Sequence, residues 1–212
     1  MRRVVRRRHS GFVNLFHSRR FGQLETESLL EFDFLSVSEC DSGIQAIISQ
    51  PVVLEWRDRS GRLHSHIPDY GVLVDGEGVI AEIKTDRDSR LTNMIDRTSS
   101  LKSALPAHGF KYEMYTESRI YQEPRYTRAQ TLLAGLSYRP SDEDISRVGR
   151  CLSGQASGKE AARIIHDLNE KPEFIYNVYA MAIDGRLLVS SDNGPLRFSI
   201  SKVEEAKYVS RI

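Results

Sequence analysis

The chain has 212 residues, of which 40% are apolar and 28% charged, and its formal net charge at pH 7 is +1. This suits one domain with an appendage, or two small domains, around an ordinary core, and no apolar run approaches the roughly 20 residues of a membrane span. The two cysteines, Cys40 and Cys151, are too few for a disulfide framework, and the first residues lack the apolar stretch of a signal peptide. We therefore expect a cytoplasmic protein without membrane partners.

Charge is distributed unevenly along the chain. The first 24 residues contain seven arginines and no acidic residue, whereas the remainder has 23 basic and 29 acidic residues. A basic arm over residues 1–24 can neutralise phosphates and bind DNA irrespective of sequence, and the alternative is a solvated tail. Because apolar residues interrupt the run, we expect an arm that docks in part and contacts DNA. The candidate DNA-binding residues are Arg2, Arg3, Arg6, Arg7, Arg8, Arg19 and Arg20.

An amphipathic helix is predicted over about residues 26–40. Thr26 or Ser28 can cap it, and apolar residues recur with helical spacing behind them. Glu31 adjoins the apolar stripe, whereas Glu27 lies one turn earlier and nearer the rim. Both are ordinary surface glutamates unless a metal site requires a third oxygen ligand, in which case Glu31 is the candidate.

Five strands are predicted next, at residues 44–49, 52–56, 63–67, 70–74 and 79–83. The last two flank the turn-forming run Asp75-Gly76-Glu77-Gly78 and therefore form a β-hairpin. His64 and His66 alternate onto one face of the third strand. Such a pair suits metal ligation or phosphate contact, although two histidines without further partners are more often partly exposed strand residues.

Three charged residues meet where the hairpin brings its strands together. If Val74 pairs with Val79, Asp69 faces Lys84, and Glu82 lies one diagonal step away on the same face. Two carboxylates at that separation repel unless a cation lies between them, and hard oxygen ligands suit Mg²⁺ or Mn²⁺. An adjacent lysine can polarise a water for attack on a phosphodiester.

Pro68-Asp69 followed after a dozen residues by Glu82-Ile83-Lys84 resembles the signature of the PD-(D/E)xK nuclease superfamily. So short a pattern also occurs by chance, and a solvated hairpin with surface charge is the alternative. The apolar neighbours of Glu82 favour the functional interpretation, because a charge on a largely buried strand usually has a function or a partner.

The remaining segments complete the predicted architecture. A helix at 89–107, a strand at 110–116 and a helix at 126–137 add to a mixed sheet flanked by helices. Beyond Tyr138 the composition changes. Helical runs at 141–152, at 157–168 and from 172 onward precede short strands at 187–189 and 198–200. Helices followed by a two-stranded ribbon resemble a winged-helix module, which binds DNA or docks a protein.

Taken together, the motifs resemble the TnsA endonuclease subunit of heteromeric transposases. The resemblance is carried by residues 27–35 (ESLLEFDFL), 50–51 (QP), 68–70 (PDY) and 82–85 (EIKT), with looser similarity at 112–117 and 198–203. It implies a restriction-endonuclease-like catalytic domain over residues 25–138 and a small, helical, winged-helix-like domain over 139–212.

The resemblance also implies an activity and partners. TnsA-like proteins cut the 5′ strand at each transposon end, together with a TnsB-like transposase and a TnsC-like ATPase. Carried over by motif, the helix glutamate falls on Glu31, the metal-binding aspartate on Asp69 and the final pair on Glu82 and Lys84. At the position of Glu82 some family members have an amide.

The resulting hypothesis is hydrolysis of DNA with Mg²⁺ or Mn²⁺. Asp69, Glu82, the carbonyl of Ile83 and Glu31 are the candidate ligands for one or two ions, and Lys84 orients the water. Two alternatives stay open. One is a stand-alone nuclease in repair, phage DNA processing or defence, and the other is a mainly architectural DNA-binding subunit.

Overall fold

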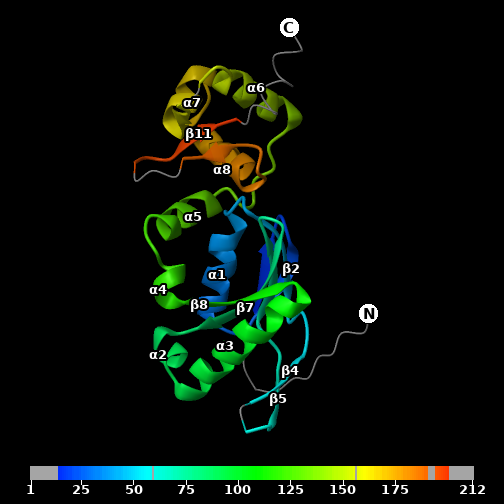
Figure 1. Cartoon of the computed structure of the whole chain (residues 1–212). Coiled ribbons are helices and arrows are strands. Elements are labelled where there is room, and N and C mark those ends of the chain that lie inside the picture. The colour runs from blue at the N-terminus through cyan, green and yellow to red at the C-terminus, as the bar shows by residue number, and fades with distance from the viewer. Residues whose placement is uncertain (1–13, 59, 156, 191–193, 201–212) are drawn as a thin grey trace.

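The computed structural model describes residues 14–58, 60–155, 157–190 and 194–200. A mixed β-sheet with helices on both faces forms the larger part of the molecule, and a helical part with a small sheet lies at one end (Figure 1). In these ranges, no helix combines the length and the apolar character that a membrane crossing requires. The mixed α/β class expected from the sequence is therefore observed.

The central sheet has four strands in the order β3-β6-β7-β8. Its strands pair antiparallel except β7 and β8, which are parallel. β3, β6 and β8 have the predicted bounds, whereas β7 begins two residues before the predicted position. The strands are β3 (Ile44–Ser49), β6 (Tyr70–Val74), β7 (Glu77–Lys84) and β8 (Phe110–Thr116).

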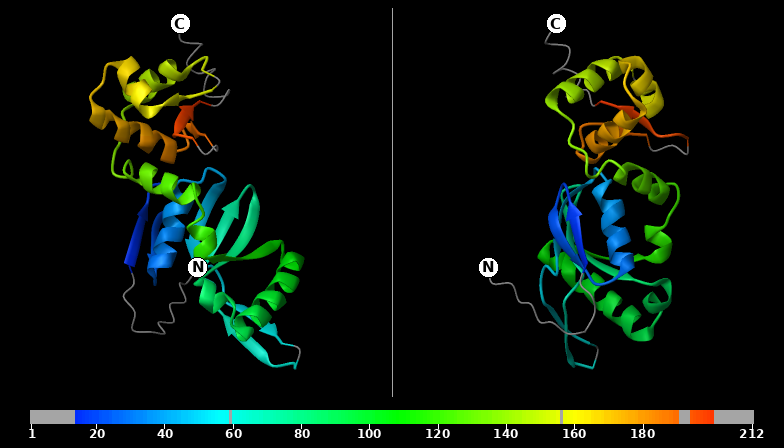
Figure 2. Two further views of the ribbon diagram at one scale, coloured as in Figure 1. Left: turned by 90° about the vertical axis from the view of Figure 1, so that its left-hand side faces the viewer. Right: turned by 180° about the vertical axis from the view of Figure 1, so that it is seen from behind.

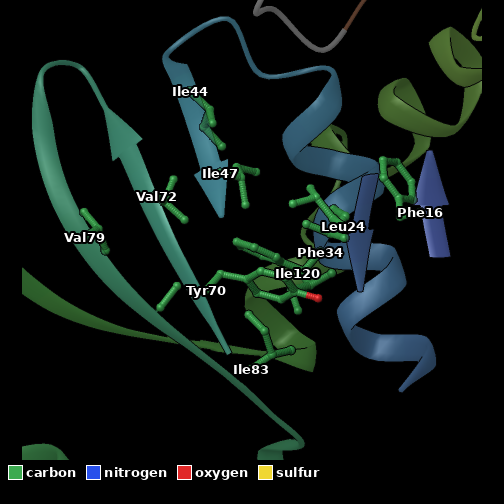
Figure 3. Close-up of a cluster of buried hydrophobic side chains, with 12 residues drawn as sticks. Phe16, Leu24, Phe34, Ile44, Ile47, Tyr70, Val72, Val79, Ile83 and Ile120 are labelled. Carbon is green, nitrogen blue, oxygen red and sulfur yellow. The ribbon is translucent and has the colours of Figure 1, made fainter. Parts of the chain in front are cut away.

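The two faces of β7 contact different helices, because side chains alternate along a strand. Val79, Ala81 and Ile83 join a core with the first helix, α1 (Leu29–Glu39). Figure 3 shows Val79 and Ile83 in this core together with Phe34 of α1. Ile80 packs on the opposite face, in a cluster with Leu101 of α3 (Thr92–Ala104). By the same alternation Glu82 and Lys84 belong to the α3 side.

The helix expected at 89–107 is divided into three pieces. A short helix α2 (Asp86–Ser89) is capped by the Thr85 hydroxyl, α3 follows after a break at Arg90 and Leu91, and a 3₁₀ turn η1 (Leu105–His108) ends the segment. Gly109 then takes a left-handed conformation with φ of +78°, which releases the chain into β8.

Two hairpins accompany the central sheet. β1 (Asn14–Ser18) and β2 (Gly22–Thr26) pair within the stretch expected to be a basic arm, and Phe16 and Leu24 are buried against the core of α1. Thr26 is therefore a strand residue, and Ser28 caps α1. β4 (Leu54–Arg57) pairs with β5 (Leu63–His66) in a hairpin that extends to the end of the molecule opposite the C-terminal part (Figure 2).

The C-terminal part combines helices with a small sheet ordered β10-β11-β9. Residues 159–160, expected inside a helix, instead form a short strand that pairs with β11. The elements from β8 onward are α4 (Glu117–Ile120), α5 (Arg125–Leu133), α6 (Asp142–Leu152), β9 (Lys159–Glu160), α7 (Ala161–Leu168), η2 (Pro172–Phe174), α8 (Ile175–Ile183), β10 (Leu188–Val189) and β11 (Arg197–Ser199).

The two parts are closely packed where α5 meets α8. A Cβ added to Gly135 would lie 2.6 Å from the backbone nitrogen of Ala180 and 2.7 Å from the carbonyl oxygen of Tyr176. Leu132 of α5 belongs to the hydrophobic core of the C-terminal part, and Cys40 at the end of α1 packs against that core. The boundary expected near residue 138 is thus bridged by a shared core.

Candidate functional site

The turn of the β6–β7 hairpin sets which residues face each other. Val74 pairs with Glu77, so the predicted pairing with Val79 was wrong by two residues. The cause is a two-residue turn at Asp75 and Gly76, whose φ angles of +50° and +80° are those favoured in tight hairpins. Because the shift is even, every side chain keeps its predicted face.

The corrected register brings Asp69 beside Glu82. Tyr70 pairs with Ala81, and continuing that ladder by one residue places the two carboxylates next to each other on the α3 side of the sheet. The Asp69 carboxylate accepts a hydrogen bond of 2.7 Å from the backbone nitrogen of Ile83. Strand pairing therefore positions Asp69 independently of any bound ion.

Three oxygen atoms converge on the Lys84 ammonium. Its Nζ lies 2.9 Å from Glu82 Oε1 and 2.9 Å from the carbonyl oxygen of Ile83. Asp69 Oδ2 lies 3.4 Å from the same nitrogen. The side chain of Lys84 is 25% exposed, so the cluster is reachable from solvent.

Glu82 is a fully buried carboxylate with two further partners. Its Oε2 lies 2.6 Å from Nε2 of His66, and its Oε1 lies 2.6 Å from Nη2 of Arg97. Burial on its own would raise the pKa of Glu82, but the hydrogen bond from His66 and the charge of Lys84 outweigh burial and lower this pKa to about 2. Glu82 therefore carries a full negative charge at neutral pH.

Asp69 is in a less favourable environment for charge. Burial and the negative charge of Glu82 raise the pKa of Asp69 to about 6, despite the opposing charge of Lys84. Burial lowers the pKa of Lys84, but the carboxylates of Asp69 and Glu82 outweigh burial and raise it. One ammonium is thus shared between two carboxylates, and a further positive charge beside Asp69 would be stabilising.

Arg97 was not among the predicted site residues, and His66 has more partners than predicted. His66 appeared to be an ordinary strand histidine, yet it contacts both Glu82 and Arg97. A signal for Arg97 does exist in the sequence, since it lies at helical spacing between Met94 and Leu101, two buried residues of α3. A charge on the buried stripe of a helix indicates a buried partner.

Glu31 lies in the first turn of α1. Its carboxylate accepts hydrogen bonds from the backbone nitrogen of Glu27, at 2.8 Å, and from the hydroxyls of Ser28 and Tyr70. Its charge contributes to the raised pKa of Asp69. The role of Glu31 as a metal ligand stays a prediction.

The arginines expected to contact DNA divide into two groups. Arg19 binds the Asp184 carboxylate with two nitrogens, and Arg20 donates hydrogen bonds to the carbonyls of Glu39, Asp41 and Ile44. Both side chains are therefore engaged within the protein rather than free to bind phosphates. The others, Arg2, Arg3, Arg6, Arg7 and Arg8, lie outside the described residues.

The donor atoms suit a hard divalent cation. Within the described ranges no group of three or more His, Cys, Asp or Glu side chains is arranged to hold a metal ion. The convergent set instead consists of two carboxylates and a backbone carbonyl, which are hard oxygen ligands of the kind that Mg²⁺ binds together with water. The Lys84 ammonium stands in for the cation, because it already contacts all three oxygens.

No family model matches the chain, and no curated protein matches it either.

Proposed function

We propose that the protein is a metal-dependent endonuclease that hydrolyses a phosphodiester bond in DNA. The observation that carries this proposal is the convergence of Asp69, Glu82 and the carbonyl of Ile83 on the Lys84 ammonium, which marks a position where three oxygen atoms bind a cation. Paired carboxylates around a cation, with a lysine next to them, are the groups that phosphodiester hydrolysis requires.

Each residue has a distinct part in the proposed reaction. Asp69, Glu82 and the carbonyl of Ile83 hold Mg²⁺ or Mn²⁺, which when bound supplies a Lewis acid for the water and the scissile phosphate. Lys84 donates hydrogen bonds and positive charge to the attacking water or to a phosphate oxygen. Displacement forms a bond from the water oxygen to phosphorus and breaks the bond from phosphorus to the 3′ oxygen. The attacking water loses a proton to solvent and the leaving 3′ oxygen takes one up, so the products are a 5′ phosphate and a 3′ hydroxyl.

We further propose that the chain acts in a TnsA-like transposition system. The resemblance of residues 27–35, 50–51, 68–70 and 82–85 to that family supports this role, as does a mixed sheet flanked by helices, which is compatible with a restriction-endonuclease-like fold. In this proposal the protein cuts the 5′ strand at transposon ends together with a TnsB-like transposase and a TnsC-like ATPase.

The C-terminal part is proposed to be the winged-helix-like partner domain. Its order of helix, short strand, two helices and a two-stranded ribbon, with β9 pairing to β11, supports that interpretation. Arg197 in β11 forms an ion pair with Glu160 of β9, so this small sheet has a side-chain link as well as backbone hydrogen bonds.

The test is nicking of labelled transposon-end DNA with Mg²⁺ or Mn²⁺, with and without the transposase and the ATPase. We expect cutting that depends on the partners and is abolished by Asp69→Ala. Asp96→Ala is the matched control, because Asp96 is an exposed residue on the neighbouring helix α3. Cutting of arbitrary DNA by the protein alone would indicate a stand-alone nuclease instead. DNA binding without cutting under any condition would indicate an architectural subunit.

A further inference from the structure

We propose that His66 and Arg97 are positioning residues that fix the orientation of the Glu82 carboxylate for metal binding. This inference rests on the proposed function and adds two residues that the PD-(D/E)xK pattern does not contain. His66 lies at the end of β5 and Arg97 in the middle of α3, so neither is close to Glu82 in sequence.

The three side chains form a closed ring of hydrogen bonds. Arg97 Nη2 donates to Glu82 Oε1 at 2.6 Å, and His66 Nε2 lies 2.6 Å from Glu82 Oε2. The ring is completed by Arg97 Nη1, which lies 3.3 Å from Nδ1 of His66. A guanidinium only donates hydrogen bonds, so Nδ1 must be the acceptor.

This geometry determines the tautomer of His66. Because Nδ1 accepts from Arg97, the ring proton is on Nε2, where it is donated to Glu82. The positive charge of Arg97 adds to that of Lys84 beside the buried carboxylate. Each member of the ring is oriented by the other two.

The ring leaves Glu82 able to accept one more partner on each oxygen. A carboxylate has about four acceptor positions, two on each oxygen. Arg97 occupies one position on Oε1 and His66 one on Oε2. The second position on Oε1 is directed to Lys84 Nζ, at 2.9 Å, where Ile83 and Asp69 also direct their oxygens. His66 and Arg97 thus orient the second lone pair of Oε1 toward the cation position.

Residues that hydrogen-bond a metal ligand contribute to metal binding even though they do not contact the metal. Loss of a residue that orients a metal ligand typically weakens metal binding or activity 10- to 100-fold. Arg97 differs here from Lys84, since the guanidinium contacts Glu82 but neither of the other two convergent oxygens. Replacing Arg97 therefore removes a hydrogen bond that orients Glu82, while Lys84 and its contacts with the three oxygens remain.

The deciding experiment is calorimetric titration of the metal-free protein with Mn²⁺. We expect Arg97→Lys, which keeps the positive charge but loses the two-nitrogen fork, to weaken Mn²⁺ binding by about 10- to 100-fold. Lys102→Met, an exposed cation on the same helix, is the control and should bind as the wild type does. Far-ultraviolet circular dichroism of each variant verifies folding.

A second measurement tests the hydrogen-bond ring in the protein without metal or DNA. Nitrogen-15 NMR of the imidazoles should show His66 protonated on Nε2 in the wild type, with this preference lost in Arg97→Met. Unchanged or tighter Mn²⁺ binding in Arg97→Lys, or a His66 protonated on Nδ1, would overturn the positioning role while leaving the nuclease proposal intact. Wild-type protein that binds no Mn²⁺ would instead overturn the proposed function, and this role with it.

Discussion

Arg19 in the turn after β1 and Asp184 at the end of α8 form a two-point ion pair that joins the N-terminal hairpin to the C-terminal part. Arg19 Nε lies 2.9 Å from Asp184 Oδ1, and Nη2 lies 2.6 Å from Oδ2. The arginine side chain is only 9% exposed, and it also donates hydrogen bonds to the carbonyls of Leu136 and Tyr138. A residue that looked like a DNA contact in the sequence thus connects the two parts of the molecule.

Replacement of Arg19 should therefore reduce stability. We expect Arg19→Ala to lower the free energy of unfolding by about 2 to 3 kcal/mol, because Asp184 loses a charged partner in a partly buried position. Denaturant unfolding measures this change. Arg139→Ala is the control, since exposed Arg139 donates to the same two carbonyls but has no ion pair with Asp184. Equal effects of the two substitutions would contradict the structural role.

Lys84 should oppose metal binding even though cutting requires it. Its ammonium contacts the three oxygens of the proposed cation position, and unit charges about 4 Å apart interact by about 4 kcal/mol at an effective dielectric of 20. We expect Lys84→Met to tighten Mn²⁺ binding at least about tenfold, which is 1.4 kcal/mol, and to abolish cutting. Titration of both proteins with Mn²⁺ provides the comparison. Weaker binding in the variant would show that Lys84 supports the cation position.

Asp69 should make stability depend on pH. Its pKa in the folded protein is about 6, above the usual 3.8, so the folded state binds more protons between these values. The resulting stabilisation is complete below about pH 4 and is lost as the pH rises through 6. We expect Asp69→Asn to gain stability relative to the wild type over this range, by about 2 to 3 kcal/mol at pH 7.

Denaturant unfolding of both proteins at several pH values, without metal, measures that difference. Any contribution of Glu82 is present in both proteins and cancels in the comparison. Asp75→Asn, at an exposed position in the β6–β7 turn, serves as the control. A difference between Asp69→Asn and the wild type that stays constant from pH 4 to 7 would contradict the environment described for Asp69.

The remaining N-terminal arginines should account for salt-dependent DNA binding. We expect replacement of Arg2, Arg3, Arg6, Arg7 and Arg8 by serine to weaken binding and to reduce the slope of log affinity against log salt by up to about 4. Fluorescence anisotropy with duplex DNA at several salt concentrations measures the slope. An unchanged slope would show that these arginines make no phosphate contacts.

Local sequence patterns were sufficient for much of the fold. The strands at 44–49, 70–74 and 110–116 have their predicted bounds, because alternating or continuous apolar residues between turn formers define a strand locally. The hairpin at 14–26 was not predicted, since its arginines suggested a basic arm that docks in part and contacts DNA. Those arginines are tolerated because Arg19 and Arg20 find acceptors on distant segments of the chain.

Some contacts of the candidate site can likewise be predicted from local patterns and others cannot. Local patterns alone predict that Asp69, Glu82 and Lys84 share one face of a hairpin, because alternation along a strand preserves that face even when the register shifts by two residues. The contacts of His66 and Arg97 with Glu82, in contrast, depend on how distant segments of the chain pack together. These residues come from a separate hairpin and a helix, and no local pattern specifies which buried carboxylate a distant cation will meet. The partners of Glu82 are set by how α3 and β5 pack beside the sheet. Because a buried charge is costly without a partner, the Glu82 carboxylate is paired with groups from both elements.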